Sequence, residues 1–362
     1  MNPAERVAWL RLARTPSVGP VLFRDLIARF GSAERAVAGL PRIASKTGGG
    51  PKLADLSVIE AEIEAGERLG CHLVLSADDA FPPLLQALDP PPPAVWVRGE
   101  AVLISRRAVA VVGARTGSAA GQRFARTLAR DLGAAGFVVV SGLARGIDAA
   151  AHEGSLATGS IAVLAGGVDD VFPPENADLY DRLIARGGAV MSERPMGARA
   201  MAKDFVRRNR LISGLSLGVV VVEAELRSGS LTTARLAVEQ NREVFAVPGS
   251  PLDPRARGTN DLIRQGAVLC EGIEDVLRAL DLPLTLARPS PRPFPEHAPV
   301  GDDEADSLRE KVRALLSLTP VPRDEIVRLT GAPAAAVNGA LMELALAGEA
   351  ELHPGGTATA AS

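Results

Sequence analysis

The residues best suited to chemistry form a cationic segment between 199 and 210. Five cations and one anion fall within these twelve residues, with an aromatic ring among them. On a helix beginning near Lys203, the side chains of Lys203, Arg207 and Arg210 share one face, and a further arginine lies beside them. Such a face suits single-stranded nucleic acid, because cations bind phosphates and a ring stacks on a base. A merely solvated face is the alternative. The candidate residues are Lys203, Phe205, Arg207, Arg208, Asn209 and Arg210.

Glycine-containing loops supply a second kind of chemistry. Glycine at a turn between strand and helix lets backbone N–H groups approach an anion, and the helix N-terminus adds partial positive charge. The spacing matches neither GxGxxG nor a P-loop, because Gly113, Gly117 and Gly121 are four residues apart and no GKS or GKT follows. Tight turning alone is the alternative role. The loops are 113–117, 141–148, 165–169, 223–230 and 248–250, and the candidates in the first two are Gly113, Ser141 and Gly142.

Two of these loops carry further candidates. Arg115 directly follows an apolar run, and its planar guanidinium suits a phosphate. An ion pair with Asp148 or Glu223 is the alternative. Ser228 and Ser230 open a helix, so either hydroxyl could cap that helix and the free N–H groups could bind a phosphate.

Groups for catalysis are few. Of the four histidines, only His152 lies near other reactive side chains, four residues after Asp148. A triad of Ser141, His152 and Asp148 can be drawn, but a pair at this spacing normally makes a hydrogen bond within one helix. The His, Cys, Asp and Glu residues show no metal-ligand spacing. We therefore expect no enzymatic activity, no metal and no cofactor.

The elements that position these residues follow from seven apolar, β-branched runs. Their starts are separated by 23 to 29 residues, with helical stretches such as 119–135 and 232–240 between them. Near-continuous apolar runs are typical of strands buried on both faces, and strand–helix repetition predicts a parallel, doubly wound sheet. The glycine loops then gather at the carboxyl ends of the strands, where such sheets bind ligands. The runs are 108–112, 137–140, 161–164, 189–191, 217–222, 244–247 and 267–269.

Composition excludes several classes of protein. The chain has 362 residues, 47% hydrophobic and 23% charged, with a net charge of −3, so it is globular and not basic throughout. Its two cysteines cannot build a disulfide scaffold, which favours a reducing compartment. The first fourteen residues lack the apolar core of a signal peptide, and the aliphatic runs are too short to cross a bilayer. We therefore predict a cytoplasmic protein with no membrane association.

Composition also divides the chain. A run of four prolines at 90–93, a proline-rich stretch with an acidic end at 287–306, and a Gly/Ala/Thr-rich end mark three breaks. The composition predicts five parts along the chain. They are a helical domain similar to SAM or helix-hairpin-helix motifs (1–88), an extended Rossmann-like domain (94–285), a linker (286–306), a winged-helix-like domain (307–353) and a disordered tail (354–362).

The C-terminal pattern is that of three short helices followed by a strand. Its recognition helix would be Ala334–Leu346, which contains no Lys or Arg. Major-groove binding needs cations for the phosphates. A role in protein contact or regulation is therefore the better interpretation of this domain.

Six motifs of the middle domain, taken together, resemble one family. The chain is similar to the DNA-processing protein A family (DprA, also called Smf), and the flanking domains agree with that family's three-part layout. The motifs are Val112-Gly-Ala-Arg115, Ser141 to His152, Phe205-Val-Arg-Arg-Asn-Arg-Leu-Ile-Ser-Gly-Leu215, Ser228-Gly-Ser-Leu-Thr-Thr-Ala-Arg235, Val247-Pro-Gly249 and Gly258-Thr-Asn260.

The resemblance implies an extended Rossmann fold that binds single-stranded DNA and is not an enzyme. It implies a homodimer that loads the RecA recombinase onto DNA coated by single-strand-binding protein during natural transformation. The family's DNA-contacting residues fall on Arg115, on the pocket aromatic Phe205, and on Lys203, whose spacing varies within the family. They also fall on Arg208 and Arg210 and on the strand-end pair Ser141 and Gly142.

Two other functions remain open. The middle fold is similar to the lysine-decarboxylase-like nucleotide phosphoribohydrolases, which carry a PGGxGTxxE signature. This chain has Ser228-Gly-Ser-Leu-Thr-Thr in that loop with no glutamate three residues on, which argues against a nucleotide-processing hydrolase. An adaptor that holds RecA and uses the pocket weakly is the other alternative, and salt-sensitive DNA binding distinguishes it from the first function.

Overall fold

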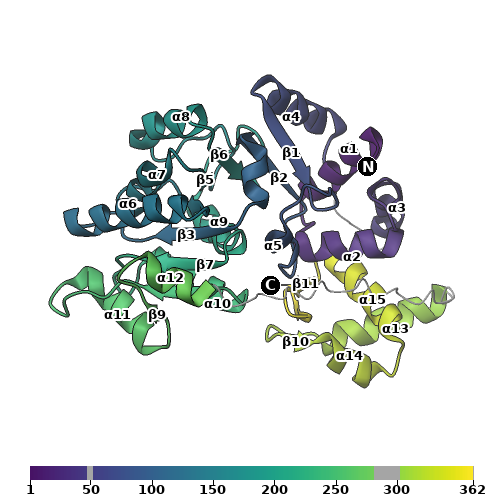
Figure 1. Ribbon diagram of the computed structural model, residues 1–362. Coiled ribbons are helices and arrows are strands. Elements are labelled where there is room, and N and C mark those ends of the chain that lie inside the picture. The colour runs from purple at the N-terminus through teal and green to yellow at the C-terminus, as the bar shows by residue number, and fades with distance from the viewer. Residues whose placement is uncertain (47–51, 281–301, 362) are drawn as a thin grey trace. The chain divides into compact units, whose positions relative to one another are not determined.

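The computed structural model describes residues 1–46, 52–280 and 302–361, which form two compact units (Figure 1). The first unit combines Met1–Ala61 and Asp89–Pro93 with the described residues from 302 onward. The second combines Glu62–Leu88 with the described residues from 94 to 280. The chain thus enters the second unit, leaves it for five residues and returns. Of the predicted linker 286–306, residues 286–301 lie outside the described residues, and residues 302–306 are not linker because they form the start of a helix.

A nine-stranded sheet forms the centre of the second unit, in the order β1-β2-β6-β5-β4-β3-β7-β8-β9. All neighbours from β6 to β9 in this order are parallel, whereas β2 pairs antiparallel with both β1 and β6. The strands are β1 (Cys71–Leu75), β2 (Ala94–Gly99), β3 (Ala108–Val112), β4 (Val138–Ser141), β5 (Ser160–Val163), β6 (Ala189–Ser192), β7 (Gly218–Val221), β8 (Glu243–Ala246) and β9 (Val268–Leu269).

The seven predicted runs form β3 to β9, which confirms the α/β fold with an extended, mostly parallel Rossmann-like sheet. Strand β1 was expected in the N-terminal domain, within 1–88, but its five residues pair with β2 in the large sheet. Residues 62–88 therefore belong to the sheet unit. The apolar segment of β1 is short, so the sequence alone does not show which strand pairs with it.

Helices cover both faces of this sheet. One face packs on α6 (Ala119–Ala134), α7 (Ile147–Ser155) and α12 (Ile273–Leu280), and the opposite face packs on α9 (Ala202–Gly214) and α10 (Gly229–Glu239). Because α6 leads from β3 to β4 and α10 leads from β7 to β8, the chain winds away in opposite directions from between β3 and β7. Ligands of such sheets bind at this switch point. The remaining helices of the unit include α5 (Pro83–Gln86), α8 (Ala177–Ala185) and α11 (Arg257–Arg264), while α4 (Leu56–Arg68) joins the two units in sequence.

The first unit contains the N-terminal helices α1 (Pro3–Arg14), α2 (Pro20–Phe30) and α3 (Ala33–Lys46). Trp9 of α1 meets Phe23 of α2 edge-on, with ring centroids 5.0 Å apart. The indole Nε1 of Trp9 also donates to the carbonyl oxygen of Pro93 at 2.9 Å. The proline-rich segment is thus anchored on the helices of this unit and is not a free spacer.

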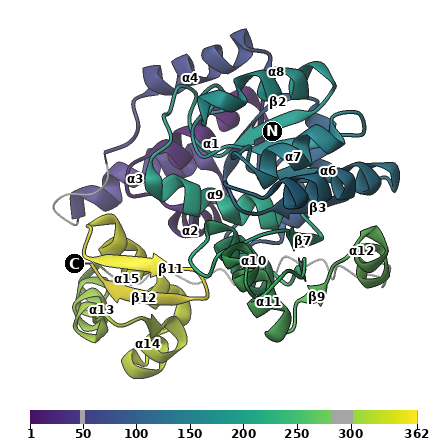
Figure 2. The same cartoon turned by 90° about the vertical axis from the view of Figure 1, so that its left-hand side faces the viewer.

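The C-terminal part of the first unit is a winged helix, as predicted (Figure 2). The prediction of a disordered tail at 354–362 is wrong. Residues Thr357–Ala360 form a strand that pairs with two others, and Ala358 is fully buried. Ala358 belongs to the apolar core of this part of the unit. The elements are α13 (Asp302–Leu315), β10 (Val321–Pro322), α14 (Arg323–Thr330), α15 (Ala334–Leu346), β11 (Ala350–His353) and β12 (Thr357–Ala360).

Helix α15 is the expected recognition helix, and it carries no Lys or Arg. Its apolar side chains are largely buried in the small core of the winged helix. Among the described residues, no single helix is long and apolar enough to cross a membrane, and α14 with α15 reach that composition only as a pair bent by 114°.

Candidate nucleic-acid interface

The turn that carries Arg115 is fixed by the loop after β4. Gly146 has a φ of +76°, and a Cβ built there would lie 2.4 Å from the carbonyl oxygen of Ala114 and 2.6 Å from that of Arg115. Only glycine permits this backbone conformation and approach without strain. The amide of Ile147 donates to the Ala114 oxygen at 3.2 Å. The two loops therefore hold each other at the carboxyl edge of β3 and β4, and Gly113 lies against the side chain of Ile147.

Arg115 is exposed and stacks on an aromatic ring. Its guanidinium carbon lies 5.6 Å from the centroid of the Phe205 ring, which belongs to α9. The ring of Phe172, 50% exposed, meets the same Phe205 ring edge-on, with centroids 5.5 Å apart. We call these three side chains the arginine–aromatic cluster. Within the described part of the chain, Arg115 forms no ion pair with either Asp148 or Glu223.

Sequence reasoning missed Phe172. Its loop follows β5 and is held by two buried hydrogen bonds: Asn176 donates to the carbonyl oxygen of Leu143 at 2.8 Å, and Tyr180 donates to that of Val168 at 2.6 Å. The loop is thus part of the rigid scaffold although the Phe172 ring is half exposed. An aromatic residue directly before two prolines, in the segment that follows a predicted strand, was the available signal.

The cationic helix begins where the sequence indicated. Helix α9 begins at Ala202, and the amide of Met201 donates to the Asp204 carboxylate at 3.0 Å, which closes its first turn. Lys203 and Arg207 are exposed. Arg210, in contrast, donates from Nη2 to both carboxylate oxygens of one glutamate, Glu193, at 2.5 and 2.6 Å, and the Nε of Arg207 lies 3.8 Å from the same group. The predicted stripe therefore presents Lys203 and Arg207 to solvent, while Arg210 is neutralised locally.

Arg208 lies beneath this surface. Only 8% of it is exposed, and its Nη1 donates to the carbonyl oxygen of Gly142 at 2.8 Å and to that of Val163. Its guanidinium therefore joins the ends of β4 and β5 to α9. Asn209 is buried as well and donates to the carbonyl oxygen of Gly229 at 3.3 Å. Both side chains support the interface from below, a placement that helical periodicity did not predict.

Burial and charge determine the electrostatics under the cluster. Burial lowers the pKa of Arg208 to about 10, and the charge of Arg115 acts in the same direction, while Asp148 opposes them. Burial also raises the pKa of Asp148, against the stabilising charge of Arg208 and the amide of Gly142, which donates to it at 3.1 Å. Arg208 and Asp148 are thus two buried groups of opposite charge, each of which favours the charged form of the other.

The serine candidates serve the backbone. The Ser141 hydroxyl is buried and donates to the carbonyl oxygen of Val111 at 2.7 Å. Ser228 is the N-cap of α10 and accepts from the amide of Ser230 at 3.4 Å, and the two hydroxyl oxygens are 2.7 Å apart. These contacts match the capping interpretation of the loop. A role of Ser141, Gly142, Ser228 or Ser230 in DNA contact stays a prediction.

The structure does not form the triad of Ser141, His152 and Asp148. The Nδ1 of His152 lies 2.7 Å from the hydroxyl of Ser160, not beside Ser141 or Asp148. His152 is fully buried, and burial, together with the charge of Arg208, lowers its pKa to about 3. Across the described ranges, no group of three or more His, Cys, Asp or Glu residues could hold a metal ion.

The fold and this cluster define a class: a Rossmann-like protein flanked by a helical domain and a winged helix. The family model described as DNA recombination-mediator protein A matches residues 72–281. The models of a DprA-like N-terminal HHH domain and of a DprA winged helix domain match residues 3–65 and 295–356. The chain belongs to the DNA recombination-mediator protein A family, as the six motifs indicated.

Relatives agree with this assignment. The chain is 40% identical over 314 residues to Protein Smf of Escherichia coli, which covers 82% of this chain and 80% of that protein. Against the DNA processing protein DprA of Bacillus subtilis it is 40% identical over 214 residues, 58% of this chain and 72% of that one.

Solved structures agree too. The X-ray structure of DprA from Streptococcus pneumoniae covers 68% of this chain and 80% of its own at 34% identity, with a TM-score of 0.57. A structure of DNA processing protein A from Helicobacter pylori, described for its single-stranded DNA binding mode, covers 58% of this chain and 95% of its own at 29% identity, with a TM-score of 0.53.

Proposed function

We propose that this protein binds single-stranded DNA through the arginine–aromatic cluster. The observation that carries the proposal is the exposed Arg115 guanidinium stacked on Phe205 beside the half-exposed ring of Phe172. A fixed cation beside ring faces binds a phosphate and stacks the neighbouring bases without selecting their sequence. The described binding mode of the Helicobacter pylori relative supports the same ligand for this chain.

The exposed cations of α9 offer further phosphate contacts near the cluster. Lys203 and Arg207 are each two residues from Phe205, so they share the face of the helix that lies away from the Phe205 ring, and they can bind phosphates where the strand passes around α9. Arg208 adds positive electrostatic potential beneath this surface, and it binds the carbonyl oxygens of Gly142 and Val163 at the strand ends that support the cluster. Binding should therefore combine strong salt dependence with preference for unpaired bases.

The biological role in this proposal is that of the family. The protein would act in the cytoplasm during natural transformation, as a homodimer that loads the RecA recombinase onto strands coated by single-strand-binding protein. It would do so without catalysing a reaction. In support, His152 is buried, bonded to Ser160 and kept neutral by its low pKa, so it cannot act as a base on a bound strand.

The test is fluorescence anisotropy of a labelled poly-dT oligonucleotide, titrated with the full chain across a salt series. We expect tight binding that weakens steeply as salt rises, and weaker binding of a duplex of equal length. Absence of binding at low salt would overturn the proposal. Equally tight binding of the duplex would show that the protein contacts phosphates alone. The aromatic rings would then have no part in the binding site.

RecA loading needs a separate assay. Formation of RecA filaments on a strand coated by single-strand-binding protein is followed with and without the full chain. We expect the chain to shorten the lag before filament growth, and an unchanged lag despite tight strand binding would leave binding intact and refute loading.

A further inference from the structure

A cavity lies at the carboxyl ends of β7 and β8, on the side of β3 opposite to β4. It has a volume of about 550 Å³, within the range of small-molecule sites. The N-terminus of α6, the ends of β7 and β8, and the segment before α11 form its walls. None of the residues of the arginine–aromatic cluster lines it. The cavity is therefore separate from that cluster.

The walls of this cavity are fixed by internal bonds. Asn260 accepts from the amide of Gly249 at 3.1 Å and donates to the carbonyl oxygen of the same residue at 2.9 Å. The amide of Ala224 donates to the carbonyl oxygen of Arg255 at 2.7 Å, and Arg255 holds the Asp253 carboxylate through two side-chain bonds of 3.0 and 2.9 Å. The site is thus preformed, and the charges of Asp253 and Arg255 are already matched.

A carboxylate occupies the anion position of the cavity. Glu223 accepts from the amide of Ser118 at 2.8 Å and from the Ser118 hydroxyl at 2.5 Å, directly at the N-terminus of α6. A Cβ at Gly121 would lie 2.5 Å from this carboxylate, so glycine is what lets the helix approach it. A phosphate is therefore excluded from this helix end. Each Glu223 oxygen accepts one bond from Ser118 and can accept another.

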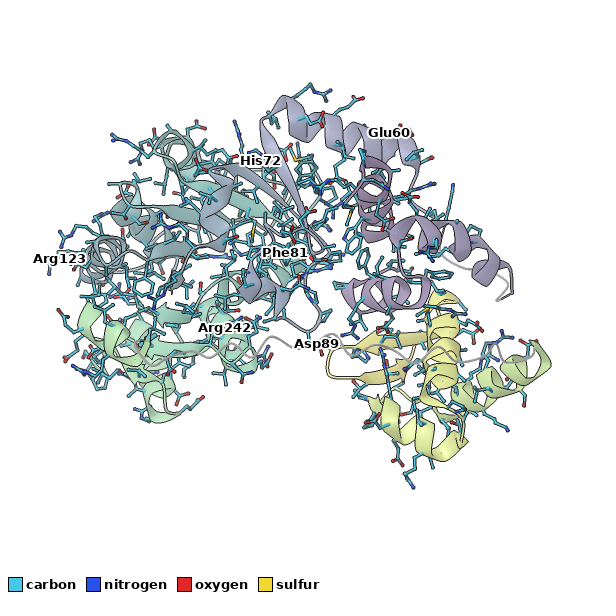
Figure 3. The ribbon with its side chains drawn as sticks, turned by 45° about the vertical axis from the view of Figure 1, so that its right-hand side comes forward. Glu60, His72, Phe81, Asp89, Arg123 and Arg242 are labelled. Carbon is cyan, nitrogen blue, oxygen red and sulfur yellow. The ribbon has the colours of Figure 1, made fainter. Side chains whose placement is uncertain are left out.

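The rest of the lining combines apolar surface with one cation, and its other polar side chains are Thr127, Ser250, Thr259 and the Asp253 carboxylate that Arg255 already binds. Phe124, Val222, Val247 and Pro248 supply flat apolar surface. Arg123 of α6 is exposed at the outer side of the unit and forms no ion pair within the described part of the chain (Figure 3). A ligand that satisfies all three features has two adjacent N–H donors on a flat ring, and an anionic group at a distance from them.

Guanine meets this requirement better than the other bases. Its Watson–Crick edge presents N1–H and N2–H side by side, which matches two carboxylate oxygens. Adenine and cytosine place a ring acceptor beside their amino group, and thymine flanks its single N–H with two carbonyl oxygens, so each would bring a lone pair against Glu223. We propose that this cavity binds a guanine nucleotide, with its base edge on Glu223 and its phosphate on Arg123.

The test is calorimetric titration of the full chain with dGMP, dAMP, dCMP and dTMP. We expect dGMP to bind at least about tenfold more tightly than the others, because one bidentate base contact discriminates by roughly this factor. Arg123→Ala should weaken dGMP binding by about tenfold, whereas Arg130→Ala, on the same helix and outside the cavity, should leave it unchanged. Equal binding of the four nucleotides, or no binding of any, would overturn the proposal.

Glu223→Gln tests the base contact itself. The amide replaces one acceptor by a donor, so dGMP should lose its preference over dAMP even though Arg123 still binds the phosphate. Because Glu223 also holds Ser118, the N-cap residue of α6, thermal unfolding of this variant is compared with the parent. If Glu223→Gln does not fold, the Arg123→Ala and Arg130→Ala pair decides the question alone. A retained preference for dGMP in the folded variant refutes the assignment of Glu223.

A guanine nucleotide could come from solution or from a strand, and a second arm separates these sources. A thymine oligonucleotide with one central guanine is compared with the all-thymine strand. Tighter binding of the guanine strand, lost in Glu223→Gln, assigns the cavity to a nucleotide of the strand. Equal strand binding together with tight dGMP binding assigns it to the free nucleotide. The inference does not rest on the proposed function, since dGMP titration reports on the cavity even if poly-dT does not bind.

Discussion

The carboxyl edge of one sheet carries two sites of opposite character, one on each side of the switch between β3 and β7. On the β4–β5 side, an exposed arginine lies on aromatic rings above a buried arginine. On the β7–β8 side, Glu223 fills the end of a helix and a cavity lies beside it. Both sides have glycine turns and strand ends of the same kind. The two sides therefore differ in their side chains: the β4–β5 side presents the cation Arg115, and the β7–β8 side holds the carboxylate of Glu223.

The largest effect, on the free energy of unfolding, should come from the buried Arg208 on the β4–β5 side. Arg208→Met keeps most of the side-chain volume but leaves the carbonyl oxygens of Gly142 and Val163 without their donor, and it removes the positive charge that favours the Asp148 carboxylate. We expect a loss of about 3–5 kcal/mol in the free energy of unfolding, because a buried charge loses its compensation. Urea denaturation measures it, with Arg207→Met as the exposed neighbour that should change by less than about 1 kcal/mol. Equal effects of the two substitutions would contradict the burial of Arg208.

The exposed charge of the first side should affect binding and not folding. Arg115→Ala is expected to weaken poly-dT binding about tenfold or more, since one charged phosphate contact contributes roughly 1.5–3 kcal/mol. Anisotropy at low salt measures this. The matched variant is Arg123→Ala from the second side, which should change poly-dT affinity less than about threefold because thymine lacks the paired donors for Glu223. Unchanged affinity for Arg115→Ala with an intact fold would remove Arg115 from the site.

His152, on the β4–β5 side, should make the free energy of unfolding depend on pH in the acid range. Its pKa is about 3 in the folded protein and 6.5 ordinarily, so between these values the unfolded chain binds a proton that the folded protein does not. Stability therefore falls as pH falls, by about 2 kcal/mol between pH 6.5 and about pH 5. The measurement is urea denaturation at both pH values for the parent and for His152→Asn, which lacks this titration. Parallel losses in both proteins would show that His152 is not the group responsible.

The smallest effect concerns the outer ring of the cluster. Phe172→Ala should weaken poly-dT binding by about 1 kcal/mol, or roughly fivefold, because one stacking surface is lost while Phe205 remains. Phe172→Tyr keeps the ring and should restore the parent affinity in the same anisotropy assay. A strand that carries abasic sites should bind both variants equally. If Phe172→Ala binds poly-dT like the parent, the cluster reduces to Arg115 and Phe205.

Much of this edge could be predicted from the sequence. The near-continuous apolar runs fixed seven strands, and parallel pairing then placed Arg115 and the loop after β4 at one edge. The cationic helix was also predicted near its true start. These inferences succeeded because burial on both faces leaves a strong apolar pattern, and because the carboxyl ends of parallel strands must meet.

The depth of each side chain could not be predicted in the same way. Adjacent arginines on α9 differ completely, since Arg207 is exposed and Arg208 is buried on backbone carbonyl oxygens. That outcome depends on how α9 crosses the ends of β4 and β5, which is a tertiary property. Phe172 and the Glu223–Ser118 contact were missed for the same reason, because each joins loops that are distant in sequence.

The antiparallel pairing of β1 with β2 has a practical consequence. The four prolines after residue 89 suggest a natural place to cut the chain, yet a fragment that begins there would lack β1. Strand β2, whose residues 94–97 are buried in the intact protein, would then become an open edge with unpaired amides. Exposed apolar edges of this kind pair with other chains. A fragment meant to stay monodisperse should therefore begin near residue 62, so that the edge keeps the strand that shields it.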